Sequence, residues 1–240
     1  MSTCPWSLVA IAALGLMACG DDPDAADRTG GASSSSTSAA SGGGGASAAS
    51  TVGVGAGGSG GTGGDGAEVL TNTPLCDFGT NVHPLEGEYG HWAAARLTPP
   101  SYPFEVQSIR YELDVFNEGC AAFAHDVFVF VESAIAPSAT PTEIERWTIA
   151  VGEAEGAVAR PLTSPITLQT GEHLFIAVEM AGTSPASRMC IRSCREHQGT
   201  SVFLPERNYW SNATATPLPW ADLQTFNLLD NYVVEALGPP

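Results

Sequence analysis

The clearest pattern in the chain is a strict alternation of apolar and charged side chains near its middle. The apolar positions are Ile109, Tyr111, Leu113 and Val115, and the charged ones between them are Arg110, Glu112 and Asp114. Successive side chains of a strand point to opposite faces, so this segment is predicted to be a half-buried strand. Just upstream, Phe104 and Val106 are apolar at the opposite parity. One extra residue exchanges the two faces, which predicts a β-bulge near Gln107 and Ser108.

Two further segments, residues 127–131 and 174–178, are apolar on both faces. Short runs of this kind are typical of strands in the middle of a sandwich, covered on both sides. Other strands are predicted where apolar residues recur with period two, at 147–151, 166–168 and 231–237, with shorter candidates at 90–97, 188–191 and 201–204.

Turn sequences separate these segments and indicate the fold class. Pro- and Gly-containing turns occur at 98–100, 117–119, 136–141 and 169–171. About eight short strands with such turns predict an all-β antiparallel sandwich or jelly roll, as a single domain over residues 67–240. One or two helical turns are expected at 220–226, after Pro219. No alternation of strands and helices is visible, which disfavours a doubly wound fold.

The beginning of the chain carries a different pattern, an apolar stretch too short to cross a membrane. Residues 8–18 are apolar apart from Gly15, and as a helix they would span only about 16 Å. A bilayer core requires ~20 apolar residues, whereas the core of a signal peptide has about this length. Residues 1–18 are therefore predicted to be an export signal, although residues 1–7 lack the usual Lys or Arg.

The end of this stretch, Leu16-Met17-Ala18-Cys19, resembles the lipobox of bacterial lipoproteins. The resemblance implies a diacylglyceryl group on Cys19, cleavage before it, and anchoring to a membrane through the lipid. In Gram-negative lipoproteins an Asp after the cysteine often marks inner-membrane retention, so Gly20 favours the outer membrane or cell surface. The alternatives are an ordinary signal peptide with an unrelated cysteine, and a cytoplasmic protein with an apolar N-terminus.

Residues 19–66 are predicted to be a disordered tether. From Gly30 to Gly64 every residue is Gly, Ala, Ser, Thr or Val, and such a tract buries too little apolar area to offset its ordering entropy. As a flexible coil the tether would span roughly 35–40 Å. A Ser/Gly tether behind a lipobox, in a chain with nine basic residues and no Lys, resembles predicted lipoproteins of myxobacteria and their relatives.

Four cysteines remain after Cys4 and Cys19 are set aside: Cys76, Cys120, Cys190 and Cys194. An even number in an exported domain predicts disulfides, with three connectivities open. We expect Cys76–Cys120 and Cys190–Cys194, the second closing a tight loop. A zinc site formed by Cys190, Cys194 and His197 is the rival interpretation, but the usual two-by-two spacing of ligands is absent.

Charge and motifs exclude some classes of function. The net charge is −17, which disfavours binding to nucleic-acid phosphates. Arg188, Arg192, Arg195 and Arg207 are close in sequence and form either a local anion-binding patch or a solvated loop. No Gly-x-Ser-x-Gly nucleophile motif lies in the folded part. A triad assembled over long range stays open, because triads are defined by geometry.

The most distinctive segment, residues 208–223, combines aromatic side chains with polar and Pro-rich sequence. The candidate ligand-binding residues are Tyr209, Trp210, Trp220, Asn212 and Asp222, with Trp92 in a second cluster. Jelly-roll carbohydrate-binding modules stack sugars on such rings. The alternative is that the tryptophans fill the core. The segment is also similar to C-terminal parts of uncharacterised exported β-sandwich domains.

These patterns together predict a membrane-anchored envelope lipoprotein that binds a glycan or another envelope protein without catalysis. An exported hydrolase with an unrecognised active site, or a structural lipoprotein without a ligand, are the alternatives. No cofactor is predicted, apart from calcium on loop carboxylates such as Asp222 and Asp230. The oligomeric state stays open.

Overall fold

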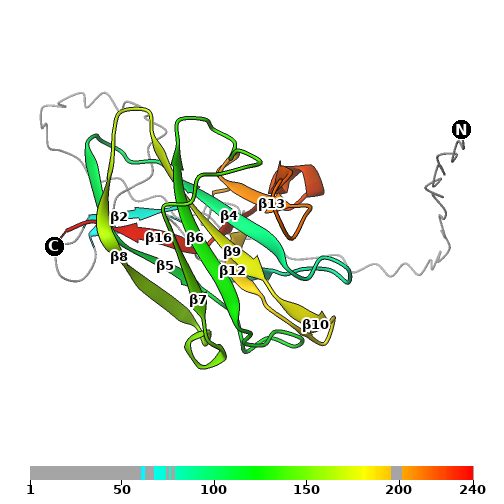
Figure 1. Ribbon diagram of the computed structural model, residues 1–240. Coiled ribbons are helices and arrows are strands. Elements are labelled where there is room, and N and C mark those ends of the chain that lie inside the picture. Colours follow the sequence, from blue (N-terminus) through cyan, green and yellow to red (C-terminus); the bar gives the residue numbers. More distant parts are fainter. Residues whose placement is uncertain (1–60, 63–67, 74–75, 77–78, 196–201, 240) are drawn as a thin grey trace, which may run out of the picture. The chain divides into compact units, whose positions relative to one another are not determined.

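The structure is a computed structural model that describes residues 61–62, 68–73, 76, 79–195 and 202–239 (Figure 1). The predicted signal segment, Cys19 and His197 lie outside these residues. The described part consists of antiparallel strands and two short 3-10 helices, which confirms the all-β sandwich-like prediction. None of its helices is long and apolar enough to span a bilayer.

The largest sheet has six strands in the order β14-β13-β4-β9-β6-β7 (Figure 1). Their bounds are β14 Trp220–Asp222, β13 Asn208–Ser211, β4 His91–Leu97, β9 His173–Met180, β6 His125–Glu132 and β7 Glu145–Ile149. The two strands predicted to be central, β6 and β9, are neighbours in the interior of this sheet, as their two-sided apolar pattern requires.

The second sheet has the order β1-β2-β16-β5-β8. Its strands are β1 Gly61–Thr62, β2 Glu68–Thr71, β16 Val234–Leu237, β5 Phe104–Glu112 and β8 Ala157–Leu168. A three-stranded sheet, β15-β12-β3, is formed by β15 Asp230–Tyr232, β12 Ile191–Arg195 and β3 Gly79–Val82, and a hairpin by β10 Gly182–Ser184 and β11 Ser187–Arg188. The short helices are η1 Val151–Glu153 and η2 Leu223–Phe226.

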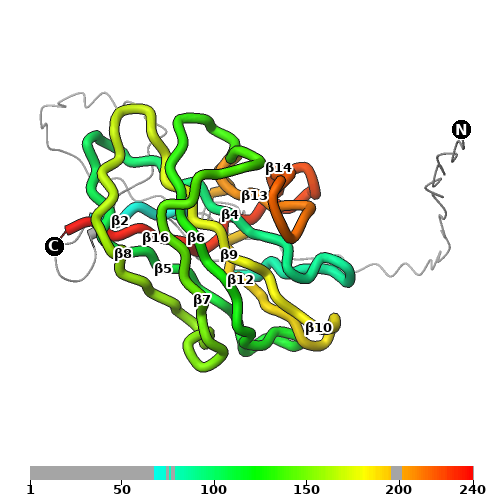
Figure 2. Tube along the Cα trace, in the orientation of Figure 1, coloured from blue at the N-terminus to red at the C-terminus, as the bar shows by residue number. Residues whose placement is uncertain are grey.

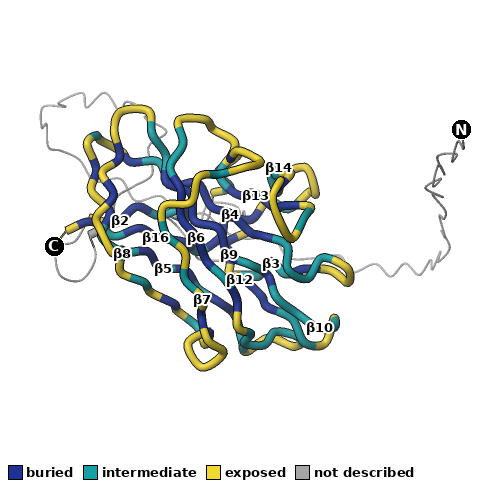
Figure 3. Tube along the Cα trace, viewed as in Figure 1, coloured by how far each residue is buried: buried dark blue, intermediate teal, exposed yellow. Residues whose placement is uncertain are grey.

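The main core lies between the six-stranded sheet and β5, β8, β12 and β16, and the buried strands in Figure 3 mark it. In β5 the predicted bulge is confirmed, because the pairing with β8 shifts between Val106 and Ser108. Val106 and Ile109 are both fully buried despite their opposite parity. The extra residue turns the strand so that both halves face the same core.

A second, smaller core covers the outer face of the six-stranded sheet. Its centre is the pair Phe130 and Phe175, whose rings stack at 4.9 Å between centroids. Two loops close over it: the Leu218 amide donates to Ala139 at 2.7 Å, and the Trp220 indole donates to Ser138 at 3.0 Å. This cover explains why β6 and β9 are apolar on both faces.

Several predicted elements differ in detail from the structure. The closing strand divides at Val233 into β15 and β16, which belong to different sheets. The predicted helix begins only at Leu223, because Asp222 is its N-cap and accepts from the Gln224 amide at 2.7 Å. Residues 202–204 are not a strand. The structure also pairs Gly61–Thr62, inside the predicted tether, with β2, since backbone pairing requires no side chain.

Candidate functional site

The disulfides join Cys76 to Cys194 and Cys120 to Cys190, so the predicted pairing was wrong. Cys190 immediately precedes β12 and Cys194 lies within it. Four residues along extended chain cover about 13 Å, beyond the ~7 Å limit between the Cα atoms of a disulfide. In both observed bridges the Cα atoms are 5.5 Å apart. All four cysteines are bridged, which also overturns the zinc interpretation.

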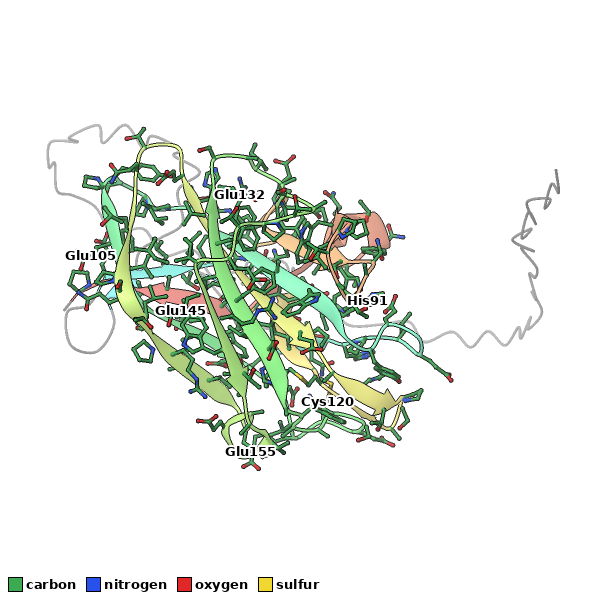
Figure 4. The ribbon with its side chains drawn as sticks, viewed as in Figure 1. His91, Glu105, Cys120, Glu132, Glu145 and Glu155 are labelled. Atoms are coloured by element: carbon green, nitrogen blue, oxygen red, sulfur yellow. A yellow bond between two sulfur atoms is a disulfide. The ribbon has the colours of Figure 1, made fainter. Side chains whose placement is uncertain are left out.

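Backbone pairing brings Cys120, labelled in Figure 4, close to Cys190. The Arg188 amide donates to Gly119 at 3.0 Å, and the Ala121 amide donates to Arg188 at 2.9 Å. Cys120 therefore lies beside the chain that leads into Cys190. The other bridge ties the residues before β3 to β12.

The predicted ligand-binding aromatics are mainly core residues. Tyr209, Trp210 and Trp92 are 3%, 5% and 5% exposed, so their rings offer no open stacking platform. Although the segment is rich in polar residues and Pro, Tyr209 and Trp210 lie in a strand, β13, between β4 and β14. Tyr209 and Trp92 pack into the second core, and Trp210 into the main core on the opposite face.

The other residues predicted to bind a ligand do not form a common site with these aromatic rings. Trp220 is half-buried against the second core. Asn212 is exposed in the loop after β13, and Asp222 caps η2. Asp230 is fully buried and accepts from Ser193 at 3.2 Å and from Arg195 at 3.1 Å. The described residues contain no group of three His, Cys, Asp or Glu side chains that could hold a metal, so calcium stays a prediction.

One cleft combines apolar walls with converging polar groups, and we call it the β3 cleft. Its volume is about 330 Å³, and it lies between β3, β13 and η2. Trp210 and Leu223 are its most buried lining residues, while Phe226, 43% exposed, is an open aromatic ring at the surface. Val82, Leu85 and Leu228 complete the apolar lining. Figure 2 traces the chain from β13 through β14, directly before η2, which carries Leu223 and Phe226.

Four polar side chains line the same cleft: Asn81, His83, Glu88 and Arg195. Most are held by neighbours, since Arg195 pairs with Asp230 and Glu88 accepts from the Leu85 amide at 2.9 Å. Fixed donors and acceptors of this kind orient a ligand in an otherwise apolar pocket.

His83 stands out among these groups because one ring nitrogen has no partner. The Arg188 guanidinium contacts its Nε2 at 3.1 Å, whereas Nδ1 is buried without a hydrogen bond. Burial, and then the charge of Arg188, lower the pKa of His83 below its usual value. The lowered pKa favours the neutral imidazole, in which one ring nitrogen donates and the other accepts.

The other histidines have structural settings. The Tyr111 hydroxyl contacts His125 Nε2 at 2.6 Å inside the core, and burial lowers the pKa of His125 while it raises that of Tyr111. His173 Nδ1 contacts the Thr98 hydroxyl at 3.0 Å. Within the described residues no histidine is hydrogen-bonded to a serine or cysteine side chain. A hydrolytic triad remains a hypothesis without a located nucleophile.

Comparison with known proteins identifies no family, because no family model and no curated protein sequence matches the chain. Two solved structures are distantly similar to the chain. One comprises the cysteine protease and lectin-like domains of Cwp84, a surface layer associated protein of Clostridium difficile, at 15% identity and a TM-score of 0.45; it covers 61% of this chain and 31% of that one. The other is the clostridial cysteine protease Cwp84 after propeptide cleavage, at 12% identity and a TM-score of 0.47, with 71% and 39% covered. The chain thus spans well under half the length of each, and similarity this distant does not define its function.

Proposed function

We propose that this chain is a lipid-anchored, extracytoplasmic binding protein whose ligand, a glycan, occupies the β3 cleft. The observation that carries the proposal is the meeting of an exposed aromatic ring, Phe226, with fixed polar groups in one cleft of about 330 Å³. That volume lies at the lower end of the range for small-ligand sites. Two disulfides support an oxidising compartment outside the cytoplasm.

The chemistry of the cleft suits a sugar ring. The C–H face of a sugar packs on an aromatic ring, which Phe226 offers at the surface. Its hydroxyls then require both donors and acceptors around the edge, and Asn81, His83 and Glu88 provide them.

Replacing Phe226 with alanine is expected to weaken glycan binding about tenfold, because the stacking face is lost. A glycan array with the full-length protein would identify the ligand, and calorimetry would then measure affinity. Phe116→Ala is the matched control, since Phe116 is 93% exposed and lies outside the cleft. Equal affinities for Phe226→Ala and wild type would remove the cleft from the binding site.

An envelope protein is the second candidate ligand, favoured by the apolar lining. Leu85, 59% exposed, and Phe226 offer an open apolar surface beside the cleft, and such surfaces mark protein interaction sites. Capture of a defined envelope protein by wild type and not by Leu85→Asp, together with no signal on the glycan array, would favour this alternative.

Anchoring depends on Cys19, which lies outside the described residues. Radiolabelled palmitate is expected to enter the wild-type protein and to be absent from Cys19→Ala, because a thiol is required for the thioether to the diacylglyceryl group. Cys4→Ala is the matched control, since that cysteine lies within the predicted signal segment. Label in Cys19→Ala, or its absence from wild type, would contradict the anchor.

A further inference from the structure

Two arginines meet across neighbouring strands on the outer face of the six-stranded sheet. The Arg96 amide donates to the Arg207 carbonyl at 2.8 Å, and the pairing of Asn208 with Ala95 continues to place Arg207 opposite Arg96. Residues directly opposite on adjacent strands have Cβ atoms about 5 Å apart. Arg96 also lowers the pKa of Arg207, after burial as the larger cause, so their charges interact.

A histidine lies beside the two arginines. Arg96 pairs with Phe175 on β9, and one step further along the same face Thr98 lies opposite His173, in agreement with their 3.0 Å hydrogen bond. Burial, and then the charges of Arg96 and Arg207, lower the pKa of His173. Three basic side chains from three segments therefore converge at this end of the sheet.

No acidic side chain in the described residues pairs with either Arg96 or Arg207. The arginines that do contact a carboxylate are Arg110, Arg146, Arg160, Arg192 and Arg195. Arg96 is only 8% exposed, and its Nε is buried without a hydrogen-bond partner. Burying a charge without a partner costs folding free energy, and repulsion between two like charges on neighbouring strands adds to that cost.

Two carboxylates flank His173 in this part of the sheet, and each accepts from a backbone amide instead of forming an ion pair with Arg96 or Arg207. Glu132, labelled at the end of β6 in Figure 4, pairs with His173 in the ladder, but its Oε2 accepts from the Ser138 amide at 2.8 Å. Glu172 accepts from the Gln169 amide at 2.7 Å. In a chain of net charge −17, the absence of any ion pair from these two arginines in the described residues suggests that their negative partner comes from outside the protein.

We propose that Arg96, Arg207 and His173 form a binding site for an oxyanion, a carboxylate, sulfate or phosphate group. Two guanidinium groups can hold such a group through paired, charge-assisted hydrogen bonds, and the Thr98 hydroxyl supplies a further polar contact nearby. We call these residues the anion site.

The anion site is separate from the β3 cleft, so it does not depend on the proposed glycan function. Arg96 has the same parity along β4 as Trp92 and Ala94, which pack in the second core. Trp210 of the cleft packs in the main core on the opposite face. A ligand could occupy one site without touching the other.

The test is thermal unfolding and calorimetry of the full-length protein with sulfate, phosphate or glucuronate, each compared with chloride at equal ionic strength. Sulfate and phosphate stabilise folded proteins generally, so the informative quantity is the difference between variants. Wild type is expected to bind at least one anion saturably, and Arg207→Gln is expected to bind it about tenfold or more weakly. Without the anion, Arg207→Gln should melt no lower than wild type, because repulsion between the arginines is relieved.

Arg192→Gln is the matched control, because the Arg192 side chain is 54% exposed and pairs with Glu112, away from the anion site. It should keep the anion response of wild type. The anion that binds most tightly indicates the chemical class of the natural ligand. Tightest binding of glucuronate indicates an acidic sugar, and tightest binding of phosphate or sulfate indicates a phosphorylated or sulfated group. The proposal is overturned if no anion binds wild type, or if Arg207→Gln and wild type respond alike.

Discussion

Replacing Cys120 and Cys190 together with alanine is expected to lower the free energy of unfolding by about 4 kcal/mol. The bridge joins residues 70 apart in sequence, so its loss frees a long loop in the unfolded chain. Alanine adds no polar group at the buried Cys190 position. Urea unfolding of the full-length protein measures the loss, and a midpoint equal to that of wild type would contradict it.

The pairing itself can be read from a non-reduced tryptic digest. Trypsin cleaves after arginine, and cleavage after Arg192 separates Cys190 from Cys194, while Cys76 and Cys120 fall on two further peptides. The structure predicts one disulfide-linked pair containing Cys120 with Cys190, and another containing Cys76 with Cys194. A linked pair containing Cys190 and Cys194 would instead restore the pairing expected from sequence.

Asn208→Ala is expected to cost about 3–5 kcal/mol of unfolding free energy, because it leaves several buried polar groups without partners. Asn208 is fully buried and connects three parts of the chain. Its Nδ2 donates to Asn231 at 3.0 Å, and its Oδ1 accepts from the Asn72 side chain and the Tyr232 amide, both at 3.0 Å. Each orphaned buried group carries a desolvation cost of ~1–3 kcal/mol.

Asn212→Ala is the control for this prediction, since Asn212 is exposed a few residues further along the same segment. Its effect should stay within about 0.5 kcal/mol. Chemical denaturation compares the two variants directly. The prediction is contradicted if both variants shift the denaturation midpoint by a similar small amount. In that case the hydrogen bonds among Asn72, Asn208 and Asn231 contribute little to the stability of the fold.

Only part of the β3 cleft could be predicted from the sequence. The segment 208–223 attracts notice because it is aromatic among polar residues, and it does supply Trp210 to the β3 cleft. The ring best placed for a ligand is Phe226, just beyond that segment. The polar partners Asn81, His83 and Glu88 come from a stretch about 130 residues earlier, where no local pattern sets them apart.

By itself the sequence determined many of the strands, the two-sided strands in the interior of the large sheet, and the bulge in β5. These features depend on local alternation, and the side-chain period of a strand decides which face each residue enters. The tertiary structure alone decided which segments became neighbours. Cys120 meets Cys190, and Arg96 meets Arg207, through strand pairings between segments far apart in the chain. Such pairings are set by the packing of the whole domain, because a local pattern specifies burial but not the partner on the next strand.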